Sequence, residues 1–390
     1  MGRDGGLSGW VRLAAGMGRD GGLSGWVRLA AVPGLGGESQ RRLLAAFGLP
    51  EAIFEASPGS LASVVGAPLA TRLLDHDATQ DIAAAEAWAC EPGNRVLTLA
   101  DADYPRSLLD GDDPPPLLYV KGRVDLLAGP ALAVVGSRNA STQGAQNAAA
   151  FAEALSLAGL TVVSGLALGI DAAAHRGALG GPGSTIAVIG TGPDRIYPAR
   201  NEALARDIAC HGAVVSEFPL GTPPLAGNFP RRNRIIAGLS KGCLVVEAAP
   251  RSGSLITARL AAELGREVFA IPGSIHSPLS KGCHSLIKQG AKLAESAEDI
   301  LEELGWNTPN SPGKGRIPAT PDAGGTASRP DETGSDEAKV LAALGHDPCS
   351  VDTLADRTGL TADTLLAMLL ALELDGRLAQ LPGGLYQQTL

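Results

Sequence analysis

The sequence is poor in cysteine and in aromatic residues, and it has no long apolar run. Its five cysteines, Cys90, Cys210, Cys243, Cys283 and Cys349, are odd in number and never form a CxxC pair. This spacing argues against a disulfide framework and a zinc site, and it is typical of a reducing compartment. No segment approaches the ~20 uninterrupted apolar residues of a membrane-spanning helix, and the N-terminus has no apolar signal core. We therefore expect a cytoplasmic protein with no membrane partner.

The signature motifs of common cofactor enzymes are missing too. No GxGxxG turn that would bind NAD follows the first expected strand, and no GxxxxGK[ST] sequence of a P-loop ATPase occurs. Neither HExxH nor a cluster of carboxylates indicates a metal. Asp171 and His175 lie four apart on one expected helix, but no nucleophile accompanies them, so we favour an ordinary hydrogen-bonded pair over an acid–base couple. The sequence predicts no cofactor, no metal and no catalytic residue: a binding protein rather than an enzyme.

The formal net charge of −9 is unevenly spread along the chain. Residues 131–300 contain 15 Lys/Arg and 12 Asp/Glu, a net charge of +3, whereas residues 335–390 contain 3 basic and 8 acidic residues, a net charge of −5. A phosphate-binding surface needs only local positive charge. The overall acidity therefore does not exclude a nucleic acid as partner.

The N-terminal part of the chain begins with a duplication, because MGRDGGLSGWVRLAA at 1–15 recurs at 17–31. True structural repeats diverge and continue for several units, so we interpret residues 1–31 as a duplicated segment of artefactual origin and leave the first copy out of the fold. Residues 32–100 are typical of a small helical domain of the SAM or helix-hairpin-helix type. Its glycine-rich turn at 32–36 could grip a DNA backbone, but the few basic residues nearby favour plain packing.

The C-terminal part is predicted to be a linker followed by a winged helix. Residues 305–334 should be a flexible linker, because the stretch 307–334 has five prolines, five glycines and one large aliphatic side chain. In residues 335–390, capped helices are followed by a hairpin, the arrangement of a winged helix. The candidate recognition helix, 361–375, has three acidic and no basic residues. We therefore interpret the winged helix as a protein-contact or regulatory element rather than a DNA reader.

Residues 101–304 alternate short apolar strands with segments of helical length. This alternation predicts an α/β fold with a doubly wound parallel sheet, an extended Rossmann-like core covered by helices on both faces. The predicted strands are 132–136, 160–164, 185–190, 213–217, 243–247 and 266–271.

The expected topology points to a ligand site. In such sheets ligands bind outside the carboxyl ends of the strands, where the strand order reverses. With the usual 3-2-1-4-5-6 order, this crevice lies between the first and fourth strands, beside a Gly-Ser-Arg turn and the arginine cluster 231–234. Arginines for phosphates, helix N-termini with free N–H groups and an aromatic ring for base stacking are what single-strand-binding grooves use. The predicted nucleic-acid-binding residues are Gly136, Ser137, Arg138, Ser164, Gly165, Phe229, Arg231, Arg232, Asn233, Arg234, Ser252 and Ser254.

Two of these assignments have a structural alternative. The arginines of 231–234 fall in the first turn of a helix, where cations oppose the helix dipole. A nearby anion is therefore favoured over a simple solvated face. Phe229 fits equally well as a base-stacking residue and as a hydrophobic staple in front of the helix.

The same motifs resemble those of the DprA/Smf family in order and spacing. After YPRSLLDGDDPPPLLYVKG come AVVGSRNAS, VVSGLALGIDAAAHRGAL, TIAVIGTGPDRIYPARN, VVSEFPLGTPPLAGNFPRRNRIIAGLS, LVVEAAPRSGSLITARLAAELGREVFAIPG and KGCHSLIKQGAKL. The resemblance covers about residues 101–300. It implies a core that binds and protects single-stranded DNA without sequence specificity, forms a homodimer and loads the recombinase RecA during natural transformation and recombination.

The resemblance also implies roles for individual residues. Arg138 would be a main phosphate contact, and Phe229 would line the same pocket. His284, Ile287 and Leu293 would lie at the dimer and RecA interface, with Ile287 facing outward.

The chain departs from the family pattern at two places. Ala199 stands where relatives often carry lysine, which leaves the adjacent Arg200 as the candidate DNA contact. Leu225 and Ala226 occupy a loop that is often basic in the family.

Two alternative functions are weighed against DNA binding. A related Rossmann group hydrolyses nucleoside monophosphates, but it needs a PGGxGT-type turn with a catalytic glutamate, and residues 251–254 here are RSGS. A transcription regulator would act through the winged helix, whose acidic recognition helix argues against it.

Overall fold

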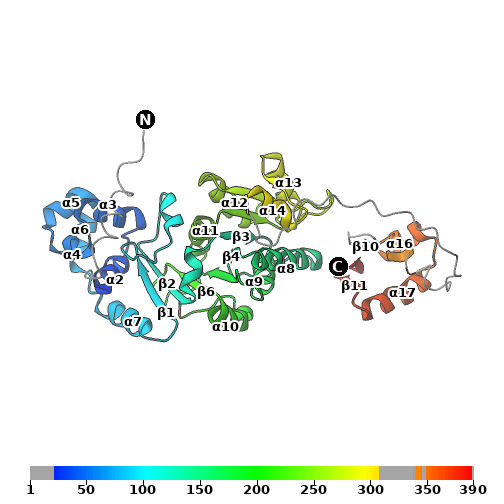
Figure 1. Cartoon of the computed structure of the whole chain (residues 1–390), viewed down its shortest axis with the longest axis horizontal. Helices are drawn as coiled ribbons and strands as arrows, with labels where there is room; N and C mark the ends of the chain where they lie inside the picture. Colours follow the sequence, from blue (N-terminus) through cyan, green and yellow to red (C-terminus); the bar gives the residue numbers. More distant parts are fainter. Residues whose placement is uncertain (1–21, 307–336, 338, 342, 345–347, 389–390) are drawn as a thin grey trace. The chain divides into compact units, whose positions relative to one another are not determined.

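The computed structural model describes residues 22–306, 337, 339–341, 343–344 and 348–388 (Figure 1). These form two compact units, one built on a large sheet with the N-terminal helices and one built on the C-terminal helices. Most of the predicted linker, 305–334, lies outside the described residues. None of the described helices is both long enough and apolar enough to span a bilayer.

A bundle of short helices precedes the sheet, as predicted for the N-terminal domain. Trp26 and Leu29 of the second sequence copy are 1% and 0% exposed in its core. The boundary predicted at residue 32 is therefore too late, because the first helix already starts at Leu23; the first copy lies outside the described residues. The helices are α2 (Leu23–Ala31), α3 (Gly37–Phe47), α4 (Pro50–Glu55), α5 (Pro58–Val65), α6 (Ala67–Asp75) and α7 (Thr79–Ala89).

A nine-stranded, mostly parallel sheet forms the centre of this unit, and the predicted doubly wound α/β fold is confirmed. Because the five central strands are covered on both faces, they are buried at every position rather than at alternate ones. The six predicted strands are β3 (Ala131–Val135), β4 (Thr161–Ser164), β5 (Thr185–Val188), β6 (Ala213–Ser216), β7 (Gly242–Val245) and β8 (Glu267–Ala270). Three unpredicted strands extend the edges: the antiparallel hairpin β1 (Asn94–Thr98) and β2 (Leu117–Gly122), and the short β9 (Lys292–Leu293).

The strand order differs from the predicted one. It is β1-β2-β6-β5-β4-β3-β7-β8-β9, so β6 lies beyond β5, and β7 rather than β6 is the second neighbour of β3. The order therefore reverses between β3 and β7. Right-handed crossovers then place helices α8–α10 on one face and α11 and α12 on the other (Figure 1). The helices are α8 (Thr142–Leu157), α9 (Ile170–Ala178), α10 (Glu202–His211), α11 (Asn228–Leu239) and α12 (Ser254–Glu263).

This order makes α11 a long crossover. It leaves β6 on one side of the sheet and packs across β5, β4 and β3 before the chain enters β7. Its N-terminus consequently reaches the carboxyl ends of the central strands, although β6 itself does not border β3. Smaller elements complete the unit: η1 (Arg106–Asp110), η2 (Val124–Ala128), η3 (Ala199–Asn201), α13 (Lys281–Lys288) and α14 (Ala297–Glu303).

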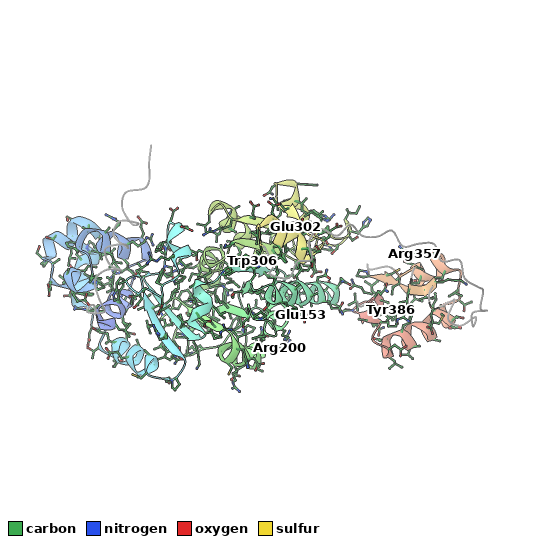
Figure 2. The ribbon with its side chains drawn as sticks, viewed as in Figure 1. Glu153, Arg200, Glu302, Trp306, Arg357 and Tyr386 are labelled. Atoms are coloured by element: carbon green, nitrogen blue, oxygen red, sulfur yellow. The ribbon has the colours of Figure 1, made fainter. Side chains whose placement is uncertain are left out.

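The C-terminal unit has its own apolar core, which includes Tyr386 (Figure 2). The predicted caps are confirmed, because the hydroxyl of Ser350 accepts the N–H of Thr353 at 3.2 Å and that of Thr361 accepts the N–H of Thr364 at 3.4 Å. Its elements are β10 (Cys349–Ser350), α16 (Val351–Thr358), α17 (Ala362–Leu374), β11 (Leu378–Leu381) and β12 (Leu385–Gln388). Two helices followed by a hairpin form the predicted winged helix.

Candidate nucleic-acid interface

The turn after β3 presents Arg138 to solvent. Gly169 packs directly beneath it with a φ of +75°, and a Cβ there would lie 2.3 Å from the carbonyl oxygen of Ser137. The N–H of Ile170 donates to that same carbonyl at 3.1 Å. Only glycine fits this close approach at this φ. Gly169 and the Ile170 N–H thus fix the backbone of the Gly136–Arg138 turn, while the Arg138 side chain is exposed.

Asp171 and His175 hold the turn after β4. The Asp171 carboxylate accepts the N–H groups of Gly165 at 3.2 Å and Ala167 at 3.3 Å, and His175 Nε2 accepts the N–H of Leu166 at 3.3 Å. Leu166 has a φ of +58°, a costly conformation for a non-glycine residue that needs such support. The two side chains therefore bond to the turn rather than to each other, contrary to the predicted pair.

The neutral form of His175 is fixed by its surroundings. Since Nε2 accepts a hydrogen bond, Nδ1 carries the proton and donates to Thr185 Oγ1 at 2.7 Å, and that hydroxyl donates to the Val162 carbonyl at 2.7 Å. Burial, followed by the positive charges of Arg232 and Arg176, lowers the pKa of His175 to about 3. This side chain has a structural role.

Phe229, in the first turn of α11, stands between two other side chains. Its ring centroid lies 5.6 Å from that of Tyr197 and 5.6 Å from the guanidinium carbon of Arg138. The ring covers Gly190, where a Cβ would lie 3.0 Å from it. Phe229 is half-buried, so one part of the ring packs on the protein and another part is accessible.

Arg232 is the buried cation of the site. It is 4% exposed and donates to the carbonyl of Gly165 at 2.7 Å and to that of Val188. Burial lowers the pKa of Arg232 to about 10 against the attraction of Asp171, and the positive charge of Arg138 lowers it further. An anion placed near these two arginines would relieve their repulsion.

Arg231 and Arg234 point elsewhere. Arg231 donates to the carboxylate of Glu217 at 2.9 Å, and Arg234 donates to the same carboxylate at 2.6 Å and to Asp113 at 3.0 Å. Asp113 is also paired with Arg41 of α3, so this ion-pair network joins α11 to the helical domain. The anion expected beside the first-turn arginines is thus supplied by the protein itself. Neither carboxylate lies within residues 222–241, a segment with four basic and no acidic residues, so the local sequence alone does not reveal these partners.

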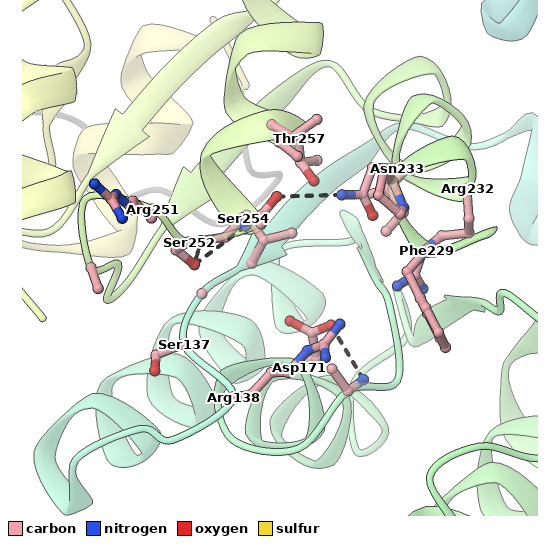
Figure 3. Close-up of a pocket in the computed structure, with 18 of the residues that line it drawn as sticks. Ser137, Arg138, Asp171, Phe229, Arg232, Asn233, Arg251, Ser252, Ser254 and Thr257 are labelled. Carbon is pink, nitrogen blue, oxygen red and sulfur yellow. Dashed lines mark hydrogen bonds between the residues drawn. The ribbon is translucent and has the colours of Figure 1, made fainter. Parts of the chain in front are cut away.

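The turn before α12 also lies beside these residues. The hydroxyls of Ser252 and Ser254 lie 2.7 Å apart, and the amide of Asn233 donates to the carbonyl of Gly253 at 3.4 Å. Arg251 is exposed at the start of this turn. Together, the turns after β3 and β7 and the start of α11 enclose a cavity of about 720 Å³ (Figure 3).

Eight of the thirteen residues predicted to bind nucleic acid line this cavity, and five do not. Ser164 is buried below it and donates to the Val134 carbonyl, Gly165 packs against the Arg232 guanidinium, and Arg200 is exposed beside α10 (Figure 2). The lining residues are Gly136, Ser137, Arg138, Phe229, Arg232, Asn233, Ser252 and Ser254.

The sequence reasoning missed several lining residues. They include Asn139, Tyr197, Arg251 and Thr257. Arg251 was detectable, because it immediately precedes a small-residue turn after a strand end. Tyr197 was not, since it comes from a loop far along the chain that only the fold brings to Phe229.

Comparison with known proteins places this arrangement in a family. The family model of DNA recombination-mediator protein A matches residues 95–305, and the model of the DprA winged helix domain matches residues 325–384. Protein Smf of Escherichia coli is 46% identical over 298 residues, which is 76% of this chain and 78% of that protein. The chain belongs to the DprA/Smf family.

Two solved DprA structures are similar to this fold. The crystal structure of DprA from Streptococcus pneumoniae matches with a TM-score of 0.65 and 42% identity, covering 72% of this chain and 97% of that one. DprA from Helicobacter pylori, whose structure is described as showing a single-stranded DNA binding mode, matches with a TM-score of 0.50 and 30% identity over 54% of this chain and 95% of that one. The predicted core and winged helix are those of a DprA protein.

The residues predicted to form a dimer and RecA interface lie in α13 and in β9, which is an edge strand of the sheet. Leu293 in β9 is 46% exposed, and His284 Nε2 lies 3.0 Å from the carbonyl of Gly273. Ile287 and its neighbour Leu286 are both half-buried and both pack against the core. Ile287 therefore does not face fully outward as predicted, and Leu293 is the most exposed of the three apolar residues Leu286, Ile287 and Leu293.

Proposed function

We propose that the protein binds single-stranded DNA without sequence specificity in the cavity at the β3–β7 switch point. One observation carries the proposal: the charged side chains lining the cavity are Arg138, Arg232, Arg251 and the single carboxylate Asp171, a net charge of +2. Phe229 and Tyr197 add aromatic surface beside the exposed Arg138. Cations for the backbone and rings for the bases are the two requirements of sequence-independent single-strand binding.

Hydrolysis of a nucleotide is not favoured by this site. Asp171 is the only Asp or Glu among the described residues that line the cavity, and its carboxylate already accepts two backbone N–H groups. Burial raises the pKa of Asp171, while Arg232 opposes this shift. Because the carboxylate is committed to holding the turn after β4, we infer a binding protein rather than an enzyme.

The proposal extends to the role implied by the family. A protein that holds single strands through phosphates and stacked bases can keep them from degradation and pass them to a recombinase. We infer that the chain acts as a homodimer in the cytoplasm and loads RecA during natural transformation and recombination, with the edge around β9 as the contact surface.

A titration of matched single- and double-stranded oligonucleotides over a salt series tests the binding proposal. We expect preference for the single strand and affinity that falls with salt, because phosphate contacts release counterions. Arg138→Ala should weaken binding to all sequences alike and lower the slope of log K against log salt by about one unit.

Arg206→Ala is the matched control. Arg206 is exposed on α10 and paired with Glu202, so its loss should leave the slope unchanged. Equal binding of single and double strands, or an Arg138→Ala slope identical to that of the wild type, would refute this site.

A further inference from the structure

The turn before α12 presents hydrogen-bond donors to the cavity. Arg251 is exposed and forms no ion pair with any described residue. The backbone N–H of Gly253, at the start of α12, donates to no described residue. The hydroxyls of Ser252 and Ser254 bond to each other at 2.7 Å, which uses one of their two protons and leaves the other available. A cation and free donors at the start of a helix together favour an anion.

Thr257, one turn into α12, adds a buried hydroxyl to the same wall. It lines the cavity although it is only 1% exposed, and Figure 3 shows its side chain pointing between Ser254 and Asn233. Helical hydroxyls often donate to the carbonyl four residues before them, as Ser240 does to Ile236 at 2.8 Å. The Thr257 hydroxyl has neither this bond nor another to the residues that the structure describes. Because a hydroxyl buried to this degree normally has a partner, this wall is suited to an acceptor from a ligand.

The charge of the cavity indicates which acceptor fits. Its lining carries a net charge of +2, and the single carboxylate, Asp171, lies away from Arg251 in Figure 3. A phosphate inside a DNA strand carries one negative charge. A phosphate esterified at one oxygen only carries about −1.5 to −2 at pH 7 and has three acceptor oxygens. The monoester therefore matches both the charge of the cavity and the number of its unused donors better than an internal phosphate.

The depth of this wall fits the end of a strand. Ser254 and Thr257 are 8% and 1% exposed, so a phosphate held against them leaves little room for a further nucleotide on its far side. Phe229 lies on the opposite side of the cavity from Arg251 (Figure 3). A phosphate beside Arg251 and a base beside Phe229 can therefore belong to one strand that ends in the cavity.

We propose that residues 251–257 form a subsite for a terminal phosphomonoester, so that the cavity binds the phosphorylated end of a single strand more tightly than its interior. Arg251, the Gly253 N–H and the hydroxyls of this segment donate to the phosphate oxygens. This subsite rests on the proposed single-strand binding in the same cavity, and it specifies which part of the strand is preferred.

Oligonucleotides that differ only at their ends test the subsite. Short oligothymidylates with a 5′-phosphate, with a 3′-phosphate or with neither are compared in displacing an internally labelled single strand from the full-length chain. One of the two phosphorylated forms should bind at least about 10-fold more tightly than the unphosphorylated form, because the monoester gains one or more charge-assisted hydrogen bonds. At matched ionic strength, inorganic phosphate should weaken binding of that form and leave the unphosphorylated form unaffected.

Substitutions of Thr257 assign the effect to this wall. Thr257→Val removes the hydroxyl at nearly constant shape, and it should reduce the ratio of the two affinities, phosphorylated to unphosphorylated, several-fold. Thr257→Ser keeps a hydroxyl and should preserve the ratio. Thr71→Val is the matched control, because Thr71 is exposed on α6. A variant that merely folds less well weakens the binding of both oligonucleotides and leaves their ratio unchanged.

The ratio should also depend on pH. The second pKa of a phosphomonoester is near 6, so the ratio should be larger at about pH 7.5 than at about pH 5.5, because the second charge is lost between these values. An internal phosphate does not titrate in this range, so the unphosphorylated form is the reference at each pH.

Three results separate this subsite from the proposed function. Equal affinity of all three oligonucleotides overturns the subsite and leaves single-strand binding in place. Equal competition by inorganic phosphate against the phosphorylated and unphosphorylated forms also overturns it, since the wall then takes internal phosphates. A ratio unchanged in Thr257→Val would place the terminal phosphate elsewhere. If none of the oligonucleotides binds, the proposed function itself is refuted.

Discussion

At the scale of single residues, the arginines near the site fall into two groups. Some form no ion pair with the described residues, and others bond to groups of the protein itself. Arg138 forms no ion pair with any described residue, while Arg232 is committed to backbone carbonyls. The sequence can locate both, because Arg138 follows a strand and Arg232 starts a helix. It cannot separate them, since burial at 4% for Arg232 depends on a turn 67 residues away. Counting local charge therefore overstates the number of phosphate contacts.

Substitutions of Phe229 test whether its ring stacks on a base or only packs against the protein. Phe229→Ala should weaken single-strand binding by about 1–3 kcal/mol while leaving the salt slope unchanged, because stacking releases no counterions. Phe229→Leu is the control: it keeps apolar contact with Gly190 but offers no ring to a base. If Phe229→Leu binds as well as the wild type, and Phe229→Ala loses thermal stability, the ring acts only as a staple.

His175 should make the fold sensitive to acid. Its folded-state pKa of about 3 lies below the ordinary value of 6.5, so the unfolded chain takes up one proton more between these values. The free energy of unfolding should therefore be fully retained above about pH 6.5 and fall below it by at most about 1.4 kcal/mol per pH unit from this residue. Denaturant unfolding between about pH 4.5 and 6.5 measures the slope.

A glutamine at this position removes the titration. His175→Gln should be less stable at neutral pH, since the hydrogen bond that supports Leu166 changes. The slope of its unfolding free energy against pH should be smaller by the contribution of one proton. His211→Gln is the matched control, because it removes an exposed histidine on α10; a change of slope that occurs only in His175→Gln assigns the effect to the buried ring. A His175→Gln slope equal to that of the wild type would contradict the buried neutral imidazole.

At the scale of elements, α11 connects the cavity to the helical domain. Its first turn brings Phe229 to the carboxyl ends of the central strands, and the next residues pair with Glu217 and, through Asp113, with Arg41 of α3. The sequence predicts the strands, since short Val- and Ala-rich runs between helices have few other interpretations. It does not predict their order, because the direction of each crossover is decided by long-range packing. The Gly-Ser-Arg turn and the first turn of α11 nevertheless line one cavity, since the long crossover of α11 brings its N-terminus to the carboxyl ends of the central strands.

Arg234 should stabilise the fold without contributing to the salt slope. It is 16% exposed and bonds the buried Glu217 at 2.6 Å, so Arg234→Met should cost about 3 kcal/mol of folding free energy by leaving that carboxylate with one partner fewer. Arg231→Met is the matched control: Arg231 is 48% exposed, and its loss should cost no more than about 1 kcal/mol. Denaturant unfolding and the salt series give the two readouts. A salt slope lowered by about one unit in either variant would make that arginine a phosphate contact after all.

At the scale of the whole molecule, the two edges of the sheet differ. The β1–β2 hairpin extends one edge next to the helical domain, whereas the other edge ends in the two-residue strand β9. A very short edge strand offers few backbone groups for pairing, so association there depends on side chains. Leu293 is the exposed apolar residue of that strand. Its place beside charged Lys292, which pairs with Glu267 and Glu303, gives an apolar centre within a polar rim, as protein interfaces have.

Leu293→Glu should convert the proposed homodimer into a folded monomer. A two-fold interface brings the same residue from both copies near the axis, and two desolvated carboxylates there repel each other. Because Leu293 is 46% exposed in the isolated chain, the substitution should leave folding intact, whereas Ile287→Glu would also disturb the core against which Ile287 packs. Light scattering reports the mass, and near-ultraviolet circular dichroism reports the fold.

The same variant tests the role of the dimer in recombination. Single-strand affinity per protomer should be retained, because no residue of β9 lines the cavity, while cooperative binding and RecA loading should fall. Leu157→Glu is the matched control, since Leu157 is 62% exposed at the end of α8, away from α13 and β9 in the sequence, and should change neither mass nor loading. A Leu293→Glu protein that stays dimeric and loads RecA at the wild-type rate would remove β9 from the interface. One that becomes monomeric yet loads RecA normally would separate dimerisation from loading and place the RecA contact on another surface.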